Sequence, residues 1–351
     1  MDETKLISKA CENLLINCAN LSKSEKLIIL SEKEELGWYK KDLSEVVYNF
    51  AKNFGLKVDL LEVAQPQNDS RDKIIELIDK YDCALFFARI GDQDRFENNI
   101  YKTKRVMSYV KDKSSLISAF GTTSNQAMLE IKKIINNLIM NSKKIEITCP
   151  LGTFVEGKID NQFKDLNTEV SVNRFPVVVH APILATNFSG KVVLANYLTP
   201  TGSKVYMPES IKLDKPITAN LDSGNILGFV GDKNIVRKVE EHYKYVSDLF
   251  SIDKNVVHSW HAGIHPGIKY NNSIHENPDR WSNTVFASPK FLHFHTCGNY
   301  APGEICWMIL NHTVKIDGKK LYENGILKVK SFQQIIDCIN KWEDLKILYD
   351  L

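Results

Sequence analysis

Short apolar runs alternate with amphipathic stretches from the N-terminus to Met140, and this order constrains the fold more than any other feature. Apolar residues recur at helical spacing over residues 3–19, 42–54, 70–80, 98–111 and 124–140. Runs of strand type lie between them, at residues 26–30, 56–63, 83–88 and 115–119. Strands that alternate with helices favour a parallel sheet flanked by helices. We therefore expect an α/β N-terminal domain over residues 1–143.

The pattern changes near residue 144. From there to about residue 235 the chain is rich in β-branched runs and turn residues, which favours mostly antiparallel strands. A helix is expected at 232–250, a hairpin around Asp317-Gly318, and a last helix at 331–349. The second part is thus expected to be a β-rich α+β domain over residues 144–351, carrying a metal-binding catalytic site.

Composition excludes several classes of protein. The 45 Lys and Arg nearly balance the 43 Asp and Glu, so no nucleic-acid partner is expected. No apolar run approaches the ~20 residues of a membrane span, and no signal peptide is evident. The seven cysteines are odd in number and contain no CxxC pair, which suits reduced thiols and a cytoplasmic location. The chain also lacks GxGxxG and GxxxxGK[ST] motifs, so no nucleotide site is expected.

Histidines are distributed very unevenly. All nine lie at residue 180 or later, and seven lie between residues 258 and 312. Histidine is a common ligand of transition metals and titrates near neutral pH. The clustering therefore indicates a metal site or a site of acid–base chemistry.

The densest segment is HSWHAGIHPG, which places His258, His261 and His265 within eight residues. Its Gly and Pro disfavour a continuous helix, so a strand that leads into a loop is expected. Sites are often built on such loops. We expect His258 or His261 to be a metal ligand and His265 to act on substrate or protons; the alternative is that they are surface or hydrogen-bonded histidines.

A second segment supplies further candidate ligands. In HFHTCGNY, His293 and His295 project to the same face if the segment is a strand. Glu304 follows after a Gly/Pro turn, and two histidines with one carboxylate form the ligand set expected for non-haem Fe(II). The same donors suit Zn or Mn. The alternatives are core or solvated histidines and a solvated carboxylate.

Two other residues are candidates for catalysis. His180 ends the apolar run FPVVVHAP and points into a cleft or, alternatively, is a hydrogen-bonded core histidine. Tyr300 lies near the His293/His295 pair, where its phenol would bind an anion or act as an acid, or simply pack.

Six segments between residues 143 and 321 carry a further signal: KKIEITCPLGTFVEG, RFPVVVHAP, GKVVLA, HSWHAGIHPG, HFHTCGNY and EICWMILNHTVKIDGKKL. Taken in this order, they resemble the aminopeptidase T family of metallopeptidases, and most closely its 2,5-dihydroxypyridine 5,6-dioxygenase branch of non-haem iron enzymes.

One departure affects what the resemblance implies. The family's last strand usually offers His-x-Asp, and Glu304 and Cys306 stand there in this sequence. A site for one ion is thus expected rather than a site for two bridged ions.

The function expected from these residues and from the resemblance is Fe(II)-dependent oxygenation of a small molecule, with dioxygen as co-substrate. The one protein partner considered is a second copy of the chain, in a homo-oligomer. A metal-dependent hydrolase of aminopeptidase type and a non-catalytic metal- or ligand-binding protein are the alternatives.

Overall fold

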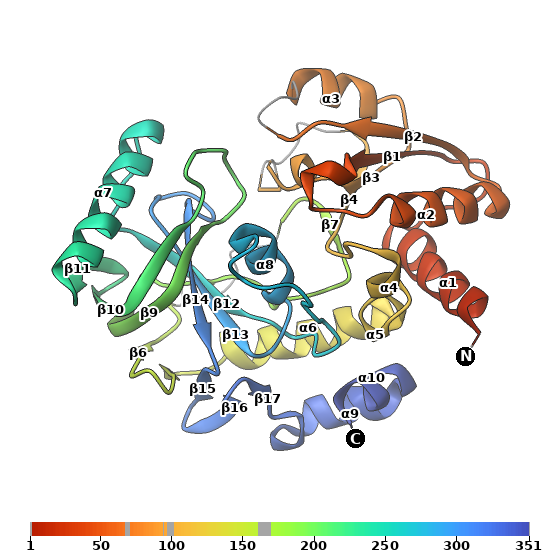
Figure 1. Cartoon of the computed structure of the whole chain (residues 1–351). Coiled ribbons are helices and arrows are strands. Elements are labelled where there is room, and N and C mark those ends of the chain that lie inside the picture. Colours follow the sequence, from red (N-terminus) through yellow and green to blue (C-terminus); the bar gives the residue numbers. More distant parts are fainter. Residues whose placement is uncertain (1, 67–70, 94, 97–101, 161–169, 351) are drawn as a thin grey trace.

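The computed structural model describes residues 2–66, 71–93, 95–96, 102–160 and 170–350. Two β-sheets dominate this part of the chain (Figure 1). The first is parallel and is flanked by helices, and the second is larger and antiparallel. This confirms the expected α/β part and β-rich part.

The first sheet has the strand order β2-β1-β3-β4-β7 among the described residues. All its neighbouring strands are parallel; they are β1 (Lys26–Glu32), β2 (Lys57–Val63), β3 (Cys83–Phe87), β4 (Lys104–Ser108) and β7 (Asn173–Phe175). Strand β3 is buried along its whole length, as a strand covered on both faces must be. The carboxyl ends of β3 and β4 therefore meet at one edge, where sites of parallel sheets usually form.

Most of the predicted elements of this part are present. The helical and 3-10 segments are α1 (Glu3–Glu12), a π-helical turn (Asn13–Cys18), a 3-10 turn (Glu34–Leu36), α2 (Lys41–Phe54), α3 (Arg71–Ile78), a 3-10 turn (Arg89–Asp92), α4 (Lys113–Leu116), α5 (Ala119–Thr122) and α6 (Asn125–Met140). Gly55 ends α2 in the left-handed conformation, as expected.

Two local predictions were wrong. Residues 104–108 form strand β4 where a helix over 98–111 was expected; residues 98–101 lie outside the described residues. The run is almost wholly buried, and a buried strand and a buried helix share such a pattern. Residues 115–119 form turns of α4 and α5 where a strand was expected, because the side chains of Asp112 and Ser118 cap these helices.

The second sheet has the order β17-β16-β15-β5-β6-β9-β14-β13-β12-β8 among the described residues, and β10 and β11 extend it from β9. Its first strands are β5 (Ile145–Thr148), β6 (Phe154–Gly157), β8 (Ile183–Leu184), β9 (Phe188–Pro200), β10 (Ile211–Asp222) and β11 (Asn225–Val230). The others are β12 (Val257–Ala262), β13 (Phe291–Thr296), β14 (Ile305–Leu310), β15 (Thr313–Ile316), β16 (Lys319–Glu323) and β17 (Ile326–Leu327). The hairpin at Asp317-Gly318 joins β15 to β16, as predicted.

Helices accompany the second sheet. They are α7 (Lys233–Phe250), α8 (Pro278–Val285), a 3-10 turn (Val329–Ser331), α9 (Gln333–Lys341) and α10 (Glu343–Tyr349). The single last helix predicted over 331–349 is thus divided, because Trp342 adopts an extended conformation. None of the helices in the described residues combines the length and the apolar character needed to cross a membrane.

The two sheets have separate hydrophobic cores, but the chain connects them closely. Helix α6 packs into the core of the second sheet through Ile131, Ile135 and Ile139. Strand β7 returns from the second part of the chain to the edge of the first sheet. Helix α8 lies between the two sheets (Figure 1), where Arg280 Nε donates to the carbonyl oxygen of Trp38 over 3.1 Å. The boundary at residues 143 and 144 remains a prediction, and packing crosses it in both directions.

Candidate metal centre

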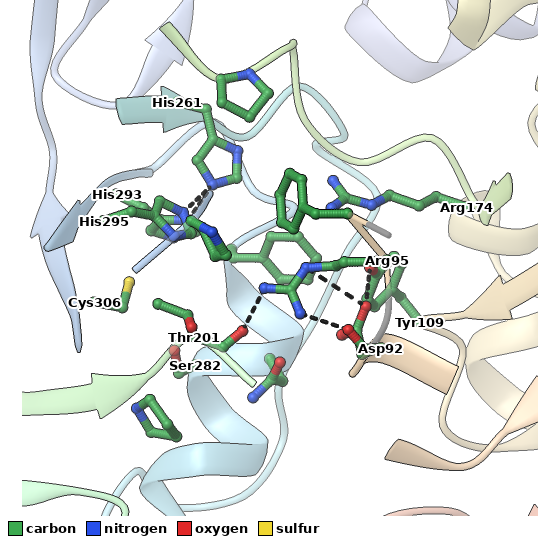
Figure 2. Close-up of a pocket in the computed structure, with 16 residues that line it drawn as sticks. Asp92, Arg95, Tyr109, Arg174, Thr201, His261, Ser282, His293, His295 and Cys306 are labelled. Carbon is green, nitrogen blue, oxygen red and sulfur yellow. Dashed lines mark hydrogen bonds and ion pairs between the residues drawn. The ribbon is translucent and has the colours of Figure 1, made fainter. Parts of the chain in front are cut away.

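His261, His293 and His295 converge on one face of the second sheet (Figure 2). Strands β12 and β13 are antiparallel, and their register places His261 directly opposite His293. His295 follows two residues later on β13 and therefore projects to the same face. The predicted pairing of His293 with His295 on one face agrees with this register.

Two of the distances among the three rings are close to those between ligands of one metal ion. His261 Nε2 lies 2.8 Å from His295 Nε2 and 3.4 Å from His293 Nδ1, and the three ligand atoms lie within 4.8 Å of one another. Two nitrogens bonded to one ion at about 2.1 Å would lie roughly 3.0–3.4 Å apart in octahedral or tetrahedral geometry. The donors are three imidazoles without a carboxylate, which suits Fe, Zn or Mn as a single ion.

Burial keeps all three rings neutral, which is the form that binds metals. Burial lowers the pKa of His293 to about 3. The pKa values of His261 and His295 are also far below the ordinary value, because burial and the neighbouring imidazoles oppose a positive charge. The outer ring nitrogens are buried without a hydrogen-bond partner among the described residues. Packing therefore orients these rings, as in the contact between His293 and Phe286.

Two expected ligands lie outside this cluster. His258 falls where the β12–β13 register shifts, and its Nδ1 is 3.1 Å from its neighbour Ser259 Oγ. Glu304 ends a turn before β14, and its Oε1 accepts hydrogen bonds from Ser203 Oγ at 2.8 Å and from the Tyr300 hydroxyl. Burial raises the pKa of Glu304 to about 7. The expectation that Glu304 and Cys306 share the face of one strand is not met, because β14 begins at Ile305.

His180 is held by the main chain. Its Nδ1 lies 2.7 Å from the Ala181 carbonyl oxygen, and its Nε2 accepts a hydrogen bond from the Ala262 N–H over 2.9 Å. Both ring nitrogens are thus engaged, which leaves no atom free for a proton transfer. The alternative of a hydrogen-bonded core histidine describes His180 better than the predicted catalytic role. Because Ala262 follows His261, the His180 ring supports the strand that carries a metal-ligand candidate.

The structure does not bring the other two predicted catalytic residues to the histidine cluster. His265 is fully buried after the end of β12, packs edge-on against Phe120, and accepts from the Gly267 N–H over 3.2 Å. Tyr300 donates to Glu304, and the Lys204 ammonium lies 4.9 Å from the centre of its ring.

A cavity of ≈ 60 Å³ adjoins the cluster. The second sheet contributes the three histidines and Cys306, which lies opposite His295 on β14. Burial raises the pKa of the Cys306 thiol to about 12, so the thiol is protonated at neutral pH.

The opposite wall of the cavity comes from the first sheet and its loops, and sequence reasoning missed it. Asp92 and Arg95 follow β3, Tyr109 follows β4, and Arg174 lies in β7 (Figure 2). Arg95 donates to the carbonyl oxygens of Asp92 and Thr201 over 2.7 and 2.8 Å. The signal in the sequence was the polar segment after the apolar run at 83–88, at the carboxyl end of a parallel strand.

Comparisons with known proteins find similarity in structure alone. No family model matches the sequence, and no curated protein matches it. The structure of 2,5-dihydroxypyridine dioxygenase from Pseudomonas putida KT2440 superposes with a TM-score of 0.60 at 11% identity, over 93% of this chain and 98% of that one. AmpT from Thermus thermophilus superposes with a TM-score of 0.51 at 12% identity, over 92% and 96%. The chain has the fold of these two proteins. The expected resemblance is thereby confirmed for the fold.

Proposed function

We propose that this chain is an enzyme with a single metal ion, held by His261, His293 and His295, and that it oxygenates a small molecule with Fe(II). The observation that carries this proposal is the convergence of three neutral imidazole nitrogens beside a cavity that Arg95 and Arg174 also line. Bound iron would supply redox chemistry with dioxygen. The residues of the chain would hold the ion, exclude water and orient the substrate.

The surroundings of the cluster support oxygenation over hydrolysis. A metal-dependent hydrolase uses a carboxylate or similar base to take the proton of the attacking water. Among the described residues, no carboxylate belongs to the histidine cluster. Asp92 accepts from the Tyr109 hydroxyl over 3.3 Å, and Glu304 accepts from Ser203 and Tyr300. The cluster itself therefore supplies no carboxylate base for hydrolysis among the described residues.

The similarity of fold to a protein named as a dioxygenase agrees with this proposal. A hydrolase that uses Zn or Mn is the second candidate, favoured by the similarity to AmpT and by the fact that three histidines also bind Zn. A binding protein without catalysis would hold the ion or a ligand without turnover.

Anaerobic loading with iron tests the proposal before any substrate is known. We expect iron at one ion per chain, and nitric oxide should give the EPR signal of an Fe(II) adduct, because the cavity side of the ion is open. The signal should be absent in His295→Ala. Oxygen uptake is then screened with small aromatic and amino-acid-derived compounds. Zinc or manganese in the purified protein, with cleavage of aminoacyl anilides and no uptake of oxygen, would replace the oxygenase with the hydrolase.

A further inference from the structure

The wall that faces the histidines carries an arginine whose guanidinium has no polar partner in the part of the chain that the structure describes. Arg174 lines the cavity from β7, and its guanidinium points toward His261 (Figure 2). Its side chain forms no hydrogen bond or ion pair with any described residue, and its Nε is buried. The guanidinium carbon Cζ lies 6.0 Å from the centre of the Tyr109 ring. The donors of this planar fork are therefore available to a ligand.

Arg95 adds a second cation on the same wall. It is almost fully buried, and its guanidinium donates to two carbonyl oxygens and lies 4.0 Å from Asp92 Oδ1. Asp92 is the one carboxylate among the cavity-lining residues that the structure describes, so two guanidinium groups face one carboxylate. Arg95, Arg174 and the three histidines line the same cavity. A divalent ion on three neutral imidazoles would add two further positive charges.

We propose that the substrate is a metal chelator that carries a carboxylate, with the chelating atoms directed to the histidine cluster and the carboxylate bound by the Arg174 fork. This assignment rests on the proposed function, since it requires an ion on the histidines. A guanidinium binds a carboxylate through two parallel hydrogen bonds, which gives both affinity and orientation. Arg95 is committed to main-chain oxygens, so it raises the local positive potential while Arg174 supplies the contact.

Matched chelators test the assignment without knowledge of the natural substrate. Catechol, 2,3-dihydroxybenzoate and 3,4-dihydroxybenzoate share the same pair of chelating oxygens and differ by a carboxylate at two positions. Their affinities are measured by calorimetry on the iron-loaded full chain without oxygen. We expect at least one dihydroxybenzoate to bind about ten- to hundredfold more tightly than catechol, as a charge-assisted hydrogen-bond pair gives.

Substitution then assigns the preference to one residue. Arg174→Gln should remove the preference for the carboxylate while iron content and catechol affinity stay as in the wild type. Arg174→Lys should keep part of it, because the charge remains and the fork is lost. Arg237→Gln, on the exposed face of α7, is the matched control for loss of one positive charge and should keep the full preference.

The outcomes separate this assignment from the function on which it rests. Catechol binding without any carboxylate preference, or a preference that survives in Arg174→Gln, would overturn the assignment and leave the metal site intact. Absence of iron and of binding by all three probes would overturn the proposed function and the assignment together.

Discussion

The two walls of the cavity differ in chemistry and in how they are held. On the second sheet, three imidazoles are neutral, and His261 lies within hydrogen-bond distance of the other two. On the first sheet, Arg95, Arg174 and Asp92 are charged, and Arg95 is tied to the main chain. Neutral donors suit an ion, and fixed cations suit an anionic substrate. If the proposed function holds, ion binding and substrate binding are divided between the two parts of the fold.

The largest effect on stability is expected from replacing Arg95, whose guanidinium connects the two walls by donating to the carbonyl oxygens of Asp92 and Thr201. Arg95→Met would leave two buried carbonyl oxygens and Asp92 without their donor, so we expect the free energy of unfolding to fall by about 3–5 kcal/mol. Urea unfolding measures this. Arg237→Met on the exposed face of α7 should change stability by less than about 0.5 kcal/mol. Equal stability of Arg95→Met and the wild type would show that the link across the cavity has no energetic weight.

Glu304 should make stability depend on pH. Its folded pKa of about 7 lies above the ordinary 4.5, so the folded chain keeps a proton that the unfolded chain loses between these values. The free energy of unfolding should therefore fall as pH rises from 4.5 to 7, by at most about 3 kcal/mol. In Glu304→Gln this component should vanish, as seen in urea unfolding at pH 5 and pH 7.5.

The exposed Glu240 provides the control for that measurement, because Glu240→Gln should keep the wild-type pH dependence. A Glu304→Gln variant whose stability still falls as steeply with pH would place the responsible carboxyl elsewhere.

His180 sharpens the contrast between a structural histidine and a ligand. His180→Phe keeps an aromatic ring but leaves the Ala262 N–H and the Ala181 carbonyl oxygen unpaired, so we expect a loss of about 2 kcal/mol in the free energy of unfolding. Iron content at saturating iron should stay near one ion per chain. A variant that is as stable as the wild type but binds no iron would make His180 a ligand instead.

The pairing of the two histidines on β13 was predictable because side chains alternate along a regular strand. Positions at an irregular stretch or in a turn were not predictable in this way. Alternation along β13 correctly paired His293 with His295. The choice between His258 and His261 stayed open because a register shift in β12 leaves no mark in the sequence. Glu304 was assigned to a strand face, but it belongs to the turn before β14.

The cationic wall could not be predicted because its residues are distant in sequence from the histidines. Arg95 follows β3, whereas Arg174 lies in a short strand that joins the first sheet from far along the chain. No local pattern marks such a strand as the neighbour of β4, since pairing between distant segments depends on the tertiary fold. The alternation of helices and strands did predict the sheet that brings them together.

The most direct test of the account is the iron content of single variants after anaerobic loading, measured by elemental analysis alongside circular dichroism to verify folding. We predict that His261→Ala, His293→Ala and His295→Ala each lose iron, while His258→Ala and Glu304→Ala retain one ion per chain. Loss of iron in His258→Ala or Glu304→Ala, with retention in folded variants of the three clustered histidines, would contradict the assignment of the metal centre.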